Sequence, residues 1–199
     1  MLNANRDIQR TPAHTRSQVL THALNLFTGQ GYFNTSVHDI AHASKVSVGS
    51  IYHHFKDKEG IARTLYEELL TQMVEEITDI LRNHTTAHSR CRAITELLFE
   101  ITVVTPETME FIIYAKHREF LPGEFPICSS KPFVMMREIV AEGMETGEIH
   151  TMDPTVATAC LFGGSIRLIT GYLDGVLEKR LPEYLEETWT CGWRAVAVV

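Results

Sequence analysis

The sequence predicts an all-α fold of about nine helices, with a three-helix helix-turn-helix domain at the N-terminus and a larger helical domain behind it. Apolar residues recur at intervals of three and four along most of the 199-residue chain, which is the spacing of one helix face. No notable run alternates apolar and polar residues as a strand would. Pro106, Pro154 and Pro182 stand where the first turn of a helix favours proline. A hydrophobic fraction of 44% is enough for a sizeable core.

The chain is expected to begin with a disordered tail at residues 1–12, which show no apolar periodicity. The first helix follows Pro12, where apolar residues begin to recur at helical spacing, and it ends at Gly29 and Gly31. Its apolar face consists of Val19, Leu20, Ala23, Leu24 and Phe27.

Two short helices joined by a tight turn are expected next. Thr35 and Ser36 are capping residues ahead of the first of them, and Ser47 is a suitable N-cap for the second, over Val48–His54. Short helices in this arrangement are typical of a helix-turn-helix domain, which we place at residues 13–58.

The rest of the chain, residues 59–199, is expected to form the larger helical domain. Apolar residues step by threes and fours from Lys58 to Leu81 and predict one helix about 36 Å long. The further helices expected are residues 90–104, a helix opened by Pro106, and residues 133–147, 154–177 and 182–197.

Charge is divided unevenly along the chain. The first 60 residues hold six Lys and Arg against four Asp and Glu, a net +2, and because the whole chain carries −7, the remainder carries −9. Protonation of histidines beside a polyanion would add positive charge to the first stretch. Six of the ten histidines lie there, namely His14, His22, His38, His42, His53 and His54. This division favours a small nucleic-acid-binding module joined to an acidic body.

Neither a membrane span nor a disulfide framework is expected. No stretch approaches about 18 uninterrupted apolar residues and the N-terminus has no apolar signal segment, which predicts a cytoplasmic protein. The four cysteines are far apart and form no CxxC pair, so we expect reduced, mostly buried thiols and no zinc site. They are Cys91, Cys128, Cys160 and Cys191.

The stretch SVGSIYHHFKDKEG at residues 47–60 places small residues ahead of an aromatic and basic cluster. Together with the two preceding helices, it resembles the tetracycline-repressor (TetR) family of bacterial transcriptional regulators over about 50 residues. The matching positions are Arg16, Val19, Leu20, Ala23, Leu24, Phe27, Gly31, Tyr32, Thr35, Ser36, Val37, Asp39, Ile40, Ala41, Val46, Ser47, Gly49, Ser50, Ile51, Tyr52, His54, Phe55, Lys58 and Glu59. The resemblance implies a homodimeric repressor that binds a near-palindromic operator, is released by a small molecule and needs no cofactor.

Small residues at the start of a recognition helix let its backbone approach base edges in the major groove. The candidates for base reading are therefore Ser47, Val48, Gly49 and Ser50. The resemblance implies contacts with the DNA backbone at Thr35, Ser36, Tyr52, His53 and Lys58. By periodicity Ile51 and Phe55 face the core.

The resemblance also implies that the larger domain binds the ligand and forms the dimer, through residues of about 154–197. Candidate pocket residues, each also typical of an ordinary core, are Met109, Phe111, Tyr114, His117, Phe133, Met136, Phe162 and Arg167. Arg167 stands in the apolar run CLFGGSIRLITGYL and needs a partner. We expect an internal one, such as Glu110, Glu119 or a backbone carbonyl, and an acidic ligand is the alternative.

Other functions stay open. No HExxH, GxSxG, P-loop or dinucleotide motif is present, so catalysis is not expected. His84 and His88, one helical turn apart, could serve a metal sensor, and Cys128 near Lys131 a redox sensor. A transcriptional activator of the same fold and a protein-interaction module with a vestigial helix-turn-helix are further alternatives.

Overall fold

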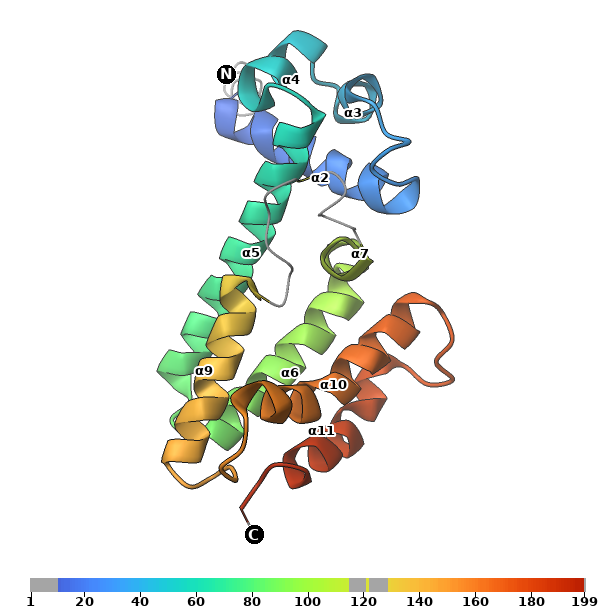
Figure 1. The fold of residues 1–199 in the computed structure, drawn as a ribbon. Helices are drawn as coiled ribbons and strands as arrows, with labels where there is room; N and C mark the ends of the chain where they lie inside the picture. The colour runs from blue at the N-terminus through green and yellow to red at the C-terminus, as the bar shows by residue number, and fades with distance from the viewer. Residues whose placement is uncertain (1–10, 115–120, 122–128, 199) are drawn as a thin grey trace, which may run out of the picture. The chain divides into compact units, whose positions relative to one another are not determined.

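The computed structural model describes residues 11–114, 121 and 129–198, and within them every named element is helical (Figure 1). The prediction of an all-α fold is confirmed. Contacts divide the chain into two compact units, residues 1–69 with 110–124, and residues 70–109 with 125–199. The helices α5 (Lys58–Asn83) and α7 (Pro106–Tyr114) each contribute residues to both units.

The first unit begins with α2 (Pro12–Gly29), whose first turn is capped by Thr11. The Thr11 hydroxyl accepts a hydrogen bond from the His14 N–H at 3.3 Å. The short helices α3 (Val37–Ser44) and α4 (Val48–Phe55) follow, with a tight turn between them. The apolar face of α2 is buried at Val19, Leu20, Ala23 and Phe27.

The junction between α4 and α5 is unusually close. The Asp57 carboxylate accepts a hydrogen bond from the Gly60 N–H at 2.6 Å and so caps the first turn of α5. A Cβ atom at Gly60 would lie 1.9 Å from the carbonyl oxygen of Phe55, which is far inside van der Waals contact. Only glycine therefore fits at residue 60 without moving the end of α4. From this junction α5 runs for 26 residues, about 39 Å.

The second unit is a cluster of helices around one apolar core. It contains α6 (Ala87–Val104), α9 (Lys131–Glu145), α10 (Pro154–Leu173), the 3-10 helix η3 (Leu181–Tyr184) and α11 (Leu185–Arg194). Helix α10 packs against α6, α9 and α11. The core residues include Ile94, Leu98, Met136, Ile139, Leu161, Phe162, Ile169 and Trp189.

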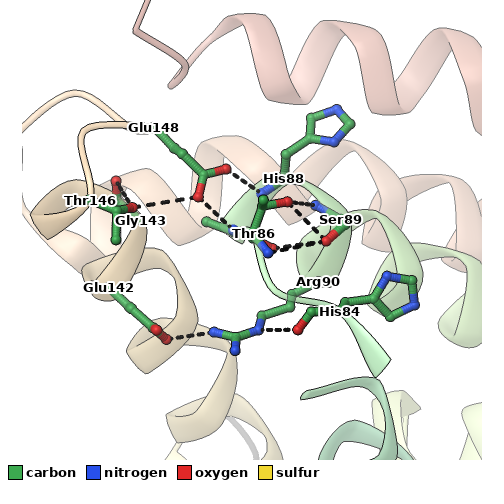
Figure 2. Close-up of polar contacts among 10 residues, drawn as sticks. His84, Thr86, His88, Ser89, Arg90, Glu142, Gly143, Thr146 and Glu148 are labelled. Atoms are coloured by element: carbon green, nitrogen blue, oxygen red, sulfur yellow. Dashed lines mark hydrogen bonds and ion pairs between the residues drawn. The ribbon is translucent and has the colours of Figure 1, made fainter. Parts of the chain in front are cut away.

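The start of α6 is held by the segment between α9 and α10 (Figure 2). The Glu148 carboxylate accepts hydrogen bonds from the backbone N–H groups of Ala87 at 2.9 Å and His88 at 3.1 Å. Close by, the Arg90 guanidinium donates to the His84 carbonyl at 2.9 Å and to the Glu142 carboxylate at 2.7 Å. Glu148 thus completes the first turn of a helix that lies far from it in sequence, and Glu142 holds the Arg90 side chain of that helix.

The ends of the last two helices differ from the sequence prediction. The helix expected over residues 154–177 ends at Leu173, because Gly175 takes a φ of 68° and the chain turns back there. The helix expected over residues 182–197 starts as the separate 3-10 turn η3 and ends at Arg194. Ala197 instead pairs with Ile149 in an isolated antiparallel bridge.

Candidate nucleic-acid interface

Helix α4 has one buried and one exposed face. Ile51 and Phe55 are 0% and 4% exposed, as their periodicity predicts. On the other face Tyr52 is 48% exposed, and His53 is exposed as well. An aromatic hydroxyl and an imidazole thus face solvent from a helix whose opposite side is fixed in the core.

The first turn of α4 presents small residues. Ser47 and Gly49 are exposed, whereas Val48 and Ser50 are half-buried. The Ser47 hydroxyl accepts a hydrogen bond from the Ser50 N–H at 3.2 Å, which makes Ser47 the predicted N-cap. A Cβ atom at Gly49 would meet nothing within 4 Å. The protein itself does not require glycine there, so the open space leaves room for close approach by a partner.

The start of α3 is fixed by a capping box. The Ser36 N–H donates to the Asp39 carboxylate at 2.8 Å, and the Asp39 N–H donates to the Ser36 hydroxyl at 3.1 Å. The Ser36 hydroxyl also donates to the carboxylate at 2.7 Å. These hydrogen bonds from the side chain and backbone of Ser36 lower the pKa of Asp39 below its usual value. The capping residue expected from the sequence is thus in place and exposed.

Thr35 requires a correction, because its side chain is only 1% exposed. Its hydroxyl lies 2.9 Å from the Gly31 carbonyl oxygen and accepts from the Gln30 amide at 3.2 Å. Its own N–H donates to the Tyr32 carbonyl at 3.2 Å. Thr35 therefore stabilises the turn between α2 and α3, and its hydroxyl cannot reach a phosphate.

Lys58 is also engaged inside the protein. Its ammonium group donates to the carbonyl oxygens of Tyr32 at 2.8 Å and Thr35 at 2.9 Å. It lies 4.2 Å from the centre of the Tyr32 ring, a cation–π contact. Partial burial lowers the pKa of Lys58 below its usual value. The first residue of α5 thus ties that helix to the α2–α3 turn, and only one of its three ammonium protons is left for a phosphate.

Comparisons with known proteins agree with this geometry. The profile of "Bacterial regulatory proteins, tetR family" matches residues 19–65, which include all of α3 and α4. The HTH-type transcriptional repressor KstR2 of Mycolicibacterium smegmatis is 30% identical over 150 residues, which is 72% of each chain. The chain belongs to the TetR family of bacterial regulatory proteins. It is a DNA-binding transcriptional regulator.

A further sequence relative and a further structural neighbour of this TetR-family regulator both come from Bacillus subtilis. The fatty acid metabolism regulator protein of Bacillus subtilis is 24% identical over 167 residues, 78% of this chain and 82% of the relative. The crystal structure of the regulator FadR from Bacillus subtilis in complex with stearoyl-CoA has the same fold, with a TM-score of 0.72 at 21% identity. That match covers 88% of this chain and 96% of the other.

The pocket candidates of the TetR-family regulator differ in their burial. Four are buried, namely Met109, Phe111, Met136 and Phe162. Phe133 is half-buried, Tyr114 is 44% exposed, and His117 lies outside the described residues. Phe111 belongs to the core of the first unit, where its ring stacks on Phe27 with 6.2 Å between centroids. For Phe111 the geometry therefore favours a core role over a pocket role.

Arg167 is exposed, although it stands in an apolar run of the sequence. Its guanidinium donates to the Thr170 hydroxyl at 3.3 Å, so a partner lies one turn along the same helix, in place of the carboxylate or backbone carbonyl that the sequence suggests. It lines a groove of about 580 Å³ between α10 and α11, together with Cys160 and Cys191 among others. Its exposure follows from its place on α10, on the side away from the buried Ile169.

The alternative sensor sites gain no support in the described part of the chain. No group of three or more His, Cys, Asp or Glu residues there could hold a metal ion. His88 packs edge-on against the rings of Trp189 at 5.1 Å and Trp193 at 4.7 Å. Cys91 is buried, and burial raises the pKa of its thiol to about 12. Cys128, the redox candidate, lies outside the described residues.

The sequence candidates do not include Lys45 and Lys56, the two residues that follow α3 and α4. Both are exposed, and both have a positive φ. The sequence does indicate these two residues. A helix that ends in a tight turn commonly has glycine directly after its last turn, whereas this chain has lysine there in both cases.

Proposed function

We propose that this regulator is a homodimeric repressor that binds a near-palindromic operator through α3 and α4 and is released by a small molecule. The observation that carries the proposal is the exposed face of α4. Small residues at its first turn can approach base edges, while Tyr52 and His53 on the following turn can reach phosphates. Ser36 at the capped start of α3 is a further candidate for the DNA backbone. An activator using the same interface is the alternative.

The proposed dimer forms through α10 and α11. By length and mean hydropathy α10 could cross a membrane, and 33% of its most apolar window is buried. A helix that packs against a second copy of the chain has the same composition and also leaves apolar surface uncovered within one copy. Val156 is 54% exposed, and a Cβ atom at Gly163 would meet nothing within 4 Å. A small, apolar and uncovered helix face is suited to close packing with its symmetry mate.

The effector proposed for first testing is a long-chain acyl-CoA. This rests on the Bacillus subtilis matches named above, a fatty acid metabolism regulator and a structure of the regulator FadR bound to stearoyl-CoA. The interior of the second unit provides apolar side chains of the kind an acyl chain requires, among them Met136 and Phe162.

We place the boundary between the DNA-binding domain and the ligand-binding domain near residue 58. We also place the protein in the cytoplasm and assign it no catalytic role.

The first experiment is selection of bound duplexes from a random DNA pool by the purified protein, followed by affinity measurements across a salt series. A two-fold-symmetric site whose half-sites are centred about 34 Å apart, with steeply salt-dependent affinity, is expected. Light scattering of the free and bound protein measures the number of chains. Failure to enrich any site, with or without effector, would count against the proposal.

The second experiment titrates stearoyl-CoA into the complex of protein and selected duplex. Release of the DNA is expected, with coenzyme A alone as the control for the headgroup and stearate as the control for the chain. A ligand shifts the equilibrium only by its differential affinity for the two states. If all three leave the complex intact, the acyl-CoA assignment fails while the assignment of the DNA-binding surface stands.

A further inference from the structure

Lys45 and Lys56 share an unusual backbone conformation. Lys45 has φ 55° and ψ 29°, and Lys56 has φ 67° and ψ −49°. Among the described residues no other non-glycine has a positive φ. At the remaining positive-φ positions the chain has glycine, namely Gly31, Gly147 and Gly175. In the described part of the chain, lysine stands at a positive-φ position only after α3 and after α4, on either side of the recognition helix.

Both conformations are costly for a residue with a side chain. Lys45 is left-handed, where Cβ crowds the following carbonyl oxygen. Lys56 is the centre of a γ-turn of the strained hand, since the Asp57 N–H donates to the Phe55 carbonyl at 2.8 Å. Glycine would adopt either conformation without this penalty. The fold therefore gains nothing from lysine at these two positions.

The side chains also make no visible contribution to the fold. Both residues are exposed, and neither ammonium group makes a hydrogen bond or ion pair within the described residues. Lys58, only two residues beyond Lys56, differs because its ammonium group is bound to two carbonyl oxygens. Strained residues of this kind gather at functional sites, and what these two provide is an outward positive charge at each end of α4.

We infer that Lys45 and Lys56 are phosphate ligands that hold the DNA backbone at the two ends of the recognition helix. This inference rests on the proposed DNA-binding function and adds two phosphate ligands to its interface. The eight residues of α4 span about 12 Å along the helix axis, and Val46 and Ser47 also lie between the two lysines. The major groove is about 12 Å wide, so two long side chains on either side of this helix can reach different phosphates at once. They would supply the positive charge that the engaged Lys58 provides only in part.

The test compares Lys45→Gly and Lys56→Gly with the wild type, on the selected operator and on a random duplex. The slope of log affinity against log salt is expected to become shallower by about 0.9 for each phosphate that is no longer neutralised, hence by roughly 1.8 for each variant of a dimer. Affinity for both duplexes is expected to fall several-fold and in the same proportion, because phosphate contacts carry no sequence information. Thermal stability is expected to stay equal or rise, since glycine relieves the strain.

Two controls separate charge from backbone. Lys45→Arg keeps the charge and should retain the wild-type salt slope, and Lys179→Ala removes an exposed charge outside the first unit and should leave binding unchanged. If the wild type binds its operator and both glycine variants keep its slope and affinity, the inference is overturned. If the wild type binds no DNA, the proposed function itself has failed. A glycine variant that loses both stability and binding would assign the lysines a structural role and also overturn the inference.

Discussion

Two glycine-to-alanine substitutions within the first unit should act in opposite directions. At Gly60 the new methyl group would lie 1.9 Å from the Phe55 carbonyl oxygen, and because the obstacle is backbone, the end of α4 must move. Such overpacking costs about 1–3 kcal/mol. At Gly49 the methyl group meets nothing within 4 Å, and replacing a helical glycine should stabilise the free protein by up to about 1 kcal/mol.

The assay is thermal and urea unfolding followed by circular dichroism, with operator affinity measured alongside. In a chain of this size 1 kcal/mol shifts Tm by roughly 2–4 °C. Gly60→Ala should lower Tm, and its operator affinity should fall because α4 is displaced. Gly49→Ala should raise Tm and still weaken operator binding, because its methyl group occupies space at the groove. A Gly60→Ala protein as stable as the wild type would refute the close junction, and a Gly49→Ala protein with unchanged operator preference would refute the assignment of Gly49.

Three further outcomes are expected. Tyr52→Ala should weaken binding to specific and random duplexes alike, because a phosphate ligand is removed, and unchanged affinity for both would remove Tyr52 from the interface. Glu148→Ala should lower the unfolding free energy by about 1–2 kcal/mol by uncapping α6, with Glu148→Gln recovering part of the loss; equal stability of all three proteins would contradict the cap. A thiol reagent at pH 8 should spare buried Cys91 in the folded protein and modify it after unfolding in urea. Since the pKa of Cys91 is raised from 9.0 to about 12, its contribution to stability is complete below pH 9 and should be lost as the pH rises toward 12.

The parts of the fold that follow from neighbouring residues could be predicted. The start of α4 depends on a hydrogen bond between Ser47 and Ser50, and the start of α3 on one between Ser36 and Asp39. Both pairs are three residues apart and can be recognised in the sequence as capping signals. The buried face of α4 follows from periodicity in the same way, because Ile51 and Phe55 are one helical turn apart.

The sequence is less informative for side chains whose environment is set by distant segments. The resemblance places Lys58 at a phosphate, whereas the fold also binds its ammonium group to carbonyl oxygens 26 and 23 residues earlier in the chain and leaves one proton for a phosphate. For Arg167 the sequence suggests a carboxylate or backbone carbonyl as partner, but α10 buries a different side, and the exposed guanidinium donates to the Thr170 hydroxyl. No local pattern marks Glu148, because it caps a helix 60 and 61 residues away.

Residues within a few turns of one another are enough to establish the helical class, the order of the helices in the first unit, their caps and the family. Which polar groups are free to meet a partner depends on the tertiary structure. Thr35 is removed from the surface by the α2–α3 turn, Lys58 is largely committed to the same turn, and Lys45 and Lys56 are left outside with strained backbones. The physical reason is that hydrogen-bonding capacity is a property of a residue type, whereas its occupancy depends on which carbonyl, amide or solvent the fold brings beside it.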